Sequence, residues 1–258
     1  MILDYKGSEI FYTDEGQGDA VVLLHGFLEN SSMWQSIIPH LKTTHRIICV
    51  DLLGHGQTKC IGYIHSMEAM ADAVKAVLDE LKIQSFTIIG HSMGGYVALA
   101  LTENYQSYVK GLCLMNSTAL EDNDERKLNR DRAIEAVKNN YKTFVSLSIN
   151  NLFAPHNRER YTKDIELVKQ EALKTPLQGI IAALEGMKRR PNREFLLQHT
   201  NFKKMLIIGR NDPVLEYATL INRTYDTATE IIVFPDGHMS HIENLKELTY
   251  KLKHFIEN

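Results

Sequence analysis

A serine at the apex of a strand–turn–helix segment is the feature that most constrains this chain. The motif GHSMGG at 90–95 directly follows the apolar run 85–89 and precedes an alanine-rich stretch with helical periodicity. Glycines at 90 and 94 remove the Cβ atoms that would block so tight a turn. The turn predicts a strained backbone at Ser92 and a hydroxyl raised above the sheet, where a base can reach it. The unpaired amides at the start of the next helix favour negative charge nearby.

Short apolar segments alternate with amphipathic segments of helical periodicity over the first 115 residues. This alternation predicts a mostly parallel sheet with helices on both faces. The expected strands are two within 2–13, then 20–24, 46–50, 85–89 and 109–115; the expected helices are 31–41, 67–81 and the segment after Ser92.

The character of the chain changes at about residue 117, where β-branched runs give way to charged, helix-periodic sequence. Strand–helix alternation resumes at 204, which predicts an all-helical insertion at 117–200 between two parts of one α/β domain, 1–116 and 201–258. The expected helices of the insertion are 124–139, 141–152, 159–174 and 177–188. Beyond it we expect strands at 204–209 and 230–234 and helices at 214–225 and 245–256.

The composition of the chain limits which binding partners and which cellular compartment we expect for the protein. The 258 residues carry a net charge of −3 and no basic run, which argues against nucleic acid or an anionic membrane surface as partner. No apolar stretch is long enough to span a bilayer, and the N-terminus lacks the pattern of a signal peptide. The three cysteines have no disulfide-like spacing, so we expect a cytoplasmic protein.

The residues that a nucleophilic serine needs stand at the ends of two later strands. A general base and a group that orients it are required, and open α/β sheets place their sites at the carboxyl ends of strands. His238 follows the apolar run 231–234 and a turn, and Asp212 follows the apolar run 205–208. Ser92, Asp212 and His238 are therefore predicted as nucleophile, acid and base.

Five motifs occur in the order typical of one family: LHGF at 24–27, DLLGHG at 51–56, GHSMGG at 90–95, GRNDP at 209–213 and GHMSHIEN at 237–244. With them the chain resembles the α/β-hydrolase superfamily along nearly its whole length, and most closely its small esterase-like branch with a helical cap. The resemblance implies an α/β-hydrolase fold with a mostly parallel eight-stranded sheet, a cap at 117–200 and a pocket between cap and sheet. It also implies an oxyanion hole formed by the backbone amides of Phe27 and Met93.

The resemblance implies a serine hydrolase that cleaves a small carboxylic ester or related acyl compound through an acyl-enzyme, without metal or organic cofactor. Ser92 argues against haloalkane dehalogenases and epoxide hydrolases, which use an aspartate there. The same triad also serves thioesterases, carbon–carbon bond hydrolases, perhydrolases and a lyase of menaquinone synthesis, and these alternatives stay open. So does a different class, a small-molecule sensor in signalling. The chain is expected to be a monomer or a homodimer.

Two further histidines complicate the assignment of the base. His241 lies three residues after His238 and is a rival base; the family motif favours His238. The pair also has the spacing of metal ligands, but no third ligand is evident from sequence, so no metal is expected. His25 and His91 flank the catalytic positions and are expected to shape the loops by hydrogen bonding.

The lining of the substrate pocket is the least constrained part of the interpretation. Candidates are His25 and the apolar residues Phe144, Leu152, Phe153, Tyr161 and Met187 of the insertion, for which plain core packing is the alternative. Arg189 and Arg190 are candidates for binding a substrate carboxylate, although a solvated helix end is the favoured interpretation.

Overall fold

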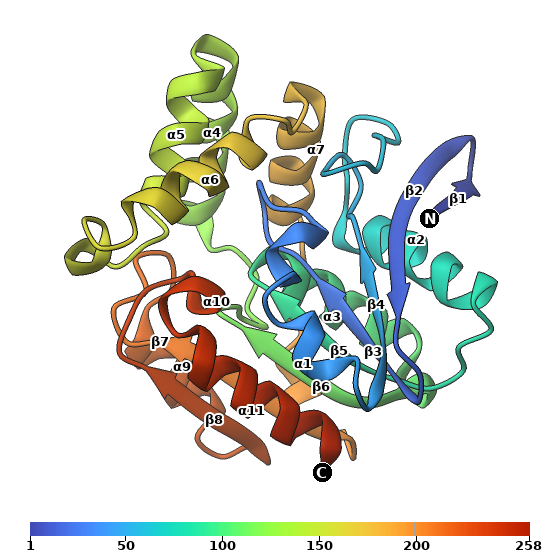
Figure 1. The fold of residues 1–258 in the computed structure, drawn as a ribbon. Helices are drawn as coiled ribbons and strands as arrows, with labels where there is room; N and C mark the ends of the chain where they lie inside the picture. The colour runs from blue at the N-terminus through green and yellow to red at the C-terminus, as the bar shows by residue number, and fades with distance from the viewer. Residues whose placement is uncertain (199) are drawn as a thin grey trace.

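The computed structural model describes residues 1–198 and 200–258 and contains one eight-stranded sheet (Figure 1). Its strand order is β1-β2-β4-β3-β5-β6-β7-β8; β1 and β2 run antiparallel to their neighbours, and the strands from β4 to β8 are parallel. The prediction of a mostly parallel eight-stranded sheet is confirmed. The strands are β1 (Ile2–Tyr5), β2 (Ser8–Glu15), β3 (Asp19–Leu24), β4 (His45–Val50), β5 (Phe86–His91), β6 (Val109–Met115), β7 (Lys203–Gly209) and β8 (Thr229–Phe234).

Helices cover both faces of the sheet because successive strand residues point to opposite sides. In β3, Val22 and Leu24 belong to one core and Val21 and Leu23 to the other. The first core packs under α2 (Met67–Glu80) and α3 (Met93–Asn104), and the second under α1 (Ile38–Leu41) and α11 (Leu245–Glu257). The central strands, buried on both faces, accordingly read as continuous apolar runs.

The helical insertion lies between β6 and β7. Its main helices are α4 (Asp124–Asn139), α5 (Tyr141–Asn150), α6 (Thr162–Ala172) and α7 (Leu177–Lys188), which Figure 1 shows gathered on one side of the sheet. Asn123 and Asn140 cap α4 and α5 by accepting backbone N–H donors with their side-chain oxygens. The shorter helices of the chain are η1 (Ser31–Trp34), η2 (Gln106–Tyr108), η3 (Pro155–Asn157), α8 (Phe195–Gln198), α9 (Tyr217–Thr224) and α10 (Ser240–Glu243).

Two glycines bring α7 against the core. A Cβ on Gly179 would lie 2.1 Å from the carbonyl oxygen of Gly54, and one on Gly186 would lie 1.7 Å from that of His65. The backbone of His65 also donates to the carbonyl oxygen of Ala182 at 2.9 Å. The insertion is thus held against the loops that follow β4. None of the described helices has both the length and the apolar character needed to cross a bilayer.

Two predicted helices differ from those observed. The segment 31–41 is divided into η1 and α1, because Pro39 lacks an N–H and its ring disfavours a continuous helix. The helix expected at 214–225 begins only at Tyr217. Asp212 accepts the N–H groups of Val214 and Leu215 at 2.8 and 3.0 Å, which holds this segment as a turn.

The turn before Ser92 requires glycine at position 90. A Cβ there would lie 2.3 Å from the carbonyl oxygen of Gly94, and this backbone cannot move without displacing α3. Gly90→Ala should therefore lower the free energy of unfolding by about 3 kcal/mol or abolish folding. Gly7→Ala is the control: a Cβ there has open space, and the left-handed φ of +75° costs only about 1 kcal/mol. Urea denaturation of both variants tests this, and equal losses would contradict the steric argument.

Candidate active site

Ser92 stands alone between β5 and α3 in a strained backbone conformation, with φ 50° and ψ −114°. Its N–H donates to the carbonyl oxygen of Met115 at 3.0 Å, and its own carbonyl accepts the Ser117 hydroxyl at 2.7 Å. A Cβ on Gly94 would lie 2.5 Å from the carbonyl oxygen of Leu24, so the start of α3 packs directly on β3. The predicted strain at this serine is confirmed, and its contacts with Met115 and Ser117 at the end of β6, together with the packing of α3 on β3, maintain it.

His238 contacts both Ser92 and Asp212. Its Nε2 lies 2.9 Å from Ser92 Oγ, and its Nδ1 lies 2.7 Å from Asp212 Oδ2. All three residues come from the carboxyl ends of strands β5, β7 and β8, which the parallel sheet places at one edge. The acceptor at Nδ1 places the proton there and leaves Nε2 free to accept from the serine hydroxyl.

The Asp212 carboxylate is fully buried and ionised. Burial by itself raises the pKa of Asp212, but the nearby His238, its hydrogen bond and further donors outweigh this and hold the pKa below its usual value. Those donors include the backbone N–H of Val214 at 2.8 Å and the Asn116 amide at 3.2 Å. A negative charge therefore remains beside the imidazole at neutral pH.

Asn116 is a site residue that the sequence interpretation missed. It follows β6 with a left-handed φ of 45°, and its amide nitrogen donates to Asp212 and to the carbonyl oxygen of Gly237. Its side-chain oxygen accepts the Ser240 hydroxyl at 2.6 Å. The available signal was its position: it ends the strand that lies between those carrying Ser92 and Asp212.

The two amides predicted for the oxyanion hole are those of Phe27 and Met93. Within residues 1–198 and 200–258, neither N–H donates to another group of the protein. Phe27 lines the same cavity as Ser92, and Met93 begins α3 directly after the serine. Both donors are thus available to an oxygen bound beside Ser92.

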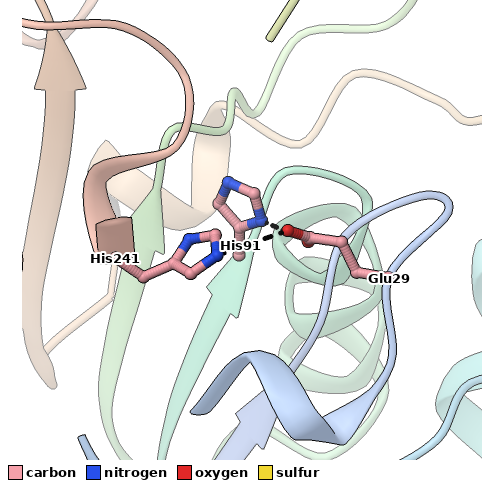
Figure 2. A group of neighbouring side chains, drawn as sticks. All are labelled: Glu29, His91 and His241. Carbon is pink, nitrogen blue, oxygen red and sulfur yellow. Dashed lines mark hydrogen bonds and ion pairs between the residues drawn. The ribbon is translucent and has the colours of Figure 1, made fainter. Parts of the chain in front are cut away.

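Glu29 and His91, the residue directly before Ser92 in the chain, form a buried ion pair (Figure 2). Glu29 Oε2 accepts from His91 Nδ1 at 2.7 Å, and His91 Nε2 lies 3.0 Å from the carbonyl oxygen of His238. Because both ring nitrogens face oxygen acceptors, the ring carries both protons and a positive charge.

The pKa values agree with this charge state. Burial alone raises the pKa of Glu29, but the charge and hydrogen bond of His91 lower it to about 2. Burial alone lowers the pKa of His91, and Glu29 more than reverses this, so the pKa of His91 is raised.

This ion pair connects three loops of the site. Besides His91, Glu29 Oε2 accepts the backbone N–H of Gly26 at 2.8 Å, next to the Phe27 amide. His91 belongs to the serine turn, and its second nitrogen holds the backbone of His238. The positions of the predicted oxyanion donor, the serine and the histidine are therefore set through one charge-assisted network.

His241 lies behind the site and does not contact Ser92. Its Nε2 is 3.7 Å from Glu29 Oε1, and burial lowers its pKa to about 4, so the ring is neutral at pH 7. The sequence offered no third metal ligand, but the fold places Glu29, His91 and His241 with candidate ligand atoms within 4.8 Å of one another. The His91 proton that Glu29 accepts already supplies the positive charge that a cation would bring.

The cavity that reaches Ser92 has a volume of about 110 Å³. Of the predicted pocket residues, Leu152 and Met187 line this cavity. The other predicted side chains lie outside its lining: His25 is held under the loop by Gly26 and Leu52, Phe153 and Tyr161 pack together, and Phe144 packs on the core. Lining residues that the sequence did not single out for the pocket include Glu29, Tyr96, Arg130, Ser148 and Val214.

Arg190 does not occupy the solvated helix end that was the favoured interpretation. Its side chain is 2% exposed and lies 2.8 Å from the buried carboxylate of Asp122. Its guanidinium stacks on the ring of Tyr96 at 3.9 Å and donates to the carbonyl oxygens of Leu120 and Met187. Arg190 is buried because the fold of the insertion places Asp122 against the end of α7.

Comparison with known proteins identifies the family. A model described as the alpha/beta hydrolase fold matches residues 19–245, and the chain belongs to this family. A thermophilic esterase from Thermogutta terrifontis superposes with a TM-score of 0.92 and 28% identity, covering 99% of this chain and 96% of that one. An esterase from Exiguobacterium antarcticum has the same fold, with a TM-score of 0.88, 22% identity, and coverage of 100% and 98%.

Two further relatives match most of this chain or a shorter segment of it. A Bacillus subtilis protein named "Putative 2-succinyl-6-hydroxy-2,4-cyclohexadiene-1-carboxylate synthase" is 28% identical over 247 residues, which cover 89% of this chain and 88% of that protein. An uncharacterized Mycobacterium tuberculosis protein is 35% identical over 102 residues. That match covers 40% of this chain and 30% of the relative, so the chain spans less than a third of the relative's length.

The Glu29–His91 pair predicts a particular pH dependence of stability. Because the pKa of Glu29 falls from 4.5 to about 2 on folding, its contribution is present above pH 4.5 and is lost as the pH falls toward 2. Because the pKa of His91 rises from 6.5, its contribution is present below pH 6.5 and is lost as the pH rises through the folded value. The stability difference between parent and Glu29→Gln should therefore be largest between these limits.

We expect Glu29→Gln to cost about 1–3 kcal/mol near pH 5.5 and progressively less as the pH falls below 4.5. The control is Glu15→Gln, which breaks an exposed ion pair with Lys42 and should change stability by about 0.5 kcal/mol or less. Urea denaturation at several pH values measures both. A cost for Glu29→Gln that does not vary with pH would contradict the buried ion pair.

Proposed function

We propose that this protein is a serine hydrolase that cleaves a small carboxylic ester, with Ser92 as nucleophile, His238 as general base and Asp212 as the group that orients the base. The supporting observation is the continuous hydrogen-bonded chain from Ser92 Oγ through His238 to Asp212, with links of 2.9 and 2.7 Å. Each link is within the distance that proton transfer requires. The esterase from Thermogutta terrifontis supports the substrate class.

In the proposed reaction His238 Nε2 takes the proton of Ser92 as Oγ attacks the ester carbonyl. The buried charge of Asp212 stabilises the imidazolium that forms. The proton then passes to the departing alcohol, and the acyl group remains on Ser92. Water activated by the same histidine releases the acid and restores the serine.

The tetrahedral intermediate places a negative charge on the former carbonyl oxygen. The N–H groups of Phe27 and Met93, which bind no other described residue, are the proposed donors to this oxyanion, and α3 adds the positive end of its dipole. Each such donor is worth about 10²–10³ in rate. Glu29 supports the Phe27 amide through its bond to Gly26.

The helical insertion, proposed as a cap at 117–200 on a core of 1–116 and 201–258, closes the site. Arg130, Ser148, Leu152 and Met187 bring its side chains into the cavity beside Ser92. The cavity of about 110 Å³ is well below the 300–1,000 Å³ typical of ligand pockets. This size supports a substrate with a short acyl chain.

Ser92→Ala should abolish hydrolysis of short p-nitrophenyl esters and labelling by a fluorophosphonate probe. The melting temperature should change by about 2 °C or less, because the Ser92 hydroxyl contacts only His238 in the described part of the chain. The control is Ser148→Ala, which also removes a hydroxyl from the cavity lining and should retain labelling. Ester turnover within tenfold of the parent in Ser92→Ala would refute the nucleophile.

The two histidines of the 237–244 segment provide a matched pair for the base. His238→Ala should lower kcat/KM by about 10³-fold or more, because no other described base lies within hydrogen-bond distance of Ser92 Oγ. His241→Ala should stay within about tenfold of the parent, because its nearest recorded partner is Glu29 at 3.7 Å. Steady-state kinetics on one ester compares both; the reverse ranking would assign the base to His241.

A further inference from the structure

The cavity beside Ser92 has an unbalanced positive charge in its cap-side wall. Among the described residues, two charged side chains line this cavity besides the imidazoles: Glu29 of the core, whose charge His91 matches, and Arg130 of α4 in the insertion. Arg130 is paired with Asp122, a carboxylate whose side chain is fully buried. The net charge at this side of the cavity therefore depends on how many positively charged side chains share the single negative charge of Asp122.

Asp122 is surrounded by three guanidinium groups. Arg130 Nε donates to its Oδ2, Arg190 Nη2 lies 2.8 Å from its Oδ1, and Arg126 Nη1 lies 3.9 Å from the same oxygen. Burial alone raises the pKa of Asp122, but these partners lower it, so it is ionised. One negative charge cannot balance three positive charges, and the cluster keeps an excess of two.

The three arginines are used differently. Arg190 is almost fully buried, and its guanidinium also donates to two backbone carbonyls, so it serves the packing of α7. Arg126 donates to the carbonyl oxygen of Val214 and does not line the cavity. Arg130 lines the cavity, and only its Nε and Nη2 contact Asp122. Its Nη1 makes no hydrogen bond within residues 1–198 and 200–258.

A hydroxyl lines the same cavity as this guanidinium edge. Ser148 of α5 lines the same cavity, and its Oγ has no hydrogen-bond partner among the described residues. A guanidinium N–H and a hydroxyl that line one small cavity can donate to the two oxygens of the same carboxylate.

From this arrangement we infer that Arg130 and Ser148 form a subsite for a carboxylate of the substrate, so that the preferred esters are anionic. The class is a short ester of a dicarboxylic acid or of a hydroxy acid, with its carboxylate a few bonds from the scissile carbonyl. The inference rests on the proposed ester hydrolysis and adds the charge of the substrate. Arg130 acts by binding and takes no part in proton transfer.

A purely structural role for Arg130 makes a different prediction. Asp122 keeps Arg190 and Arg126 when Arg130 is replaced, so the fold retains two partners for its buried charge. If Arg130 served only Asp122, its replacement would lower activity on neutral and anionic esters alike. A carboxylate subsite requires a loss confined to anionic substrates.

The test compares matched esters. Monomethyl succinate and dimethyl succinate share an acyl skeleton and differ in the terminal charge; acetoxyacetate and its methyl ester carry that difference on the alcohol side. In the parent, the anionic member of at least one pair should have kcat/KM about tenfold higher or more. Arg130→Gln should lower kcat/KM for that anionic ester about ten- to a hundredfold, mainly through KM, and leave the neutral ester within threefold.

Two further variants provide the controls. Arg126→Gln removes the same charge from the same helix and the same cluster. The Arg126 side chain does not itself line the cavity and reaches it only through its hydrogen bond to the Val214 backbone, so the anionic preference should persist. Arg130→Lys keeps the charge and loses the planar fork, and should recover part of the preference. Equal loss of preference in Arg126→Gln would mean that the general positive field, and not Arg130, selects the substrate.

Succinate binding, measured by isothermal titration calorimetry, makes the outcome independent of turnover. The parent should bind succinate at least tenfold more tightly than Arg130→Gln does. Binding of succinate without hydrolysis of any ester would refute the proposed function and keep the subsite. Hydrolysis of neutral esters with no anionic preference, and succinate binding unchanged in Arg130→Gln, would refute the subsite and keep the proposed function.

Discussion

The buried Glu29–His91 ion pair is the interaction on which the arrangement of the site depends. It lies where the loop after β3, the serine turn after β5 and the histidine loop after β8 meet. Each of these loops follows a parallel strand. The parallel arrangement by itself determines only that the three loops lie at the same edge of the sheet. The short bonds from one carboxylate and one imidazolium determine how the three backbones face one another. Removing either charge leaves the other buried without its partner, which is costly.

The helical insertion is linked to the same loops from the opposite side. The backbone N–H of His238 donates to the carbonyl oxygen of Leu152 at 2.9 Å. Glu243 accepts the N–H groups of Ala154 and Gly237 with its two carboxylate oxygens, at 3.0 and 3.1 Å. The histidine loop is therefore held by the core through His91 and by the insertion through Leu152 and Glu243. Side chains of the insertion can form part of the pocket because this contact keeps them in place.

Charge is distributed unevenly between the two sides of the cavity. On the core side, Glu29 and His91 neutralise each other, and Asp212 faces the histidine that receives the proton in the proposed reaction. On the insertion side, Asp122 is outnumbered by arginines. In such a site the two functions have different locations. The core supplies the groups proposed to react, and the insertion supplies the charged groups proposed to select the substrate. The same core can therefore serve different substrates when the insertion differs.

The sequence by itself determined the sheet, the order of its elements, the helical insertion and the candidates Ser92, Asp212 and His238, because local periodicity and turn chemistry specify strands, helices and strand ends. The sequence also indicated that these three residues lie close together, because parallel strands bring their carboxyl ends to one edge of the sheet. Tertiary structure alone decided the partners of Glu29, Asn116, Asp122 and Arg130. Glu29 meets His91 across 62 positions of the chain, and Asn116 meets Asp212 across 96; such contacts leave no periodic signal. Asp122 and Arg130 are close in the chain, but only the fold shows that they pair and that Arg190 joins them. The same reason explains Arg190: its neighbours along the chain suggest a solvated helix end, whereas the carboxylate that buries it comes from the far end of the insertion.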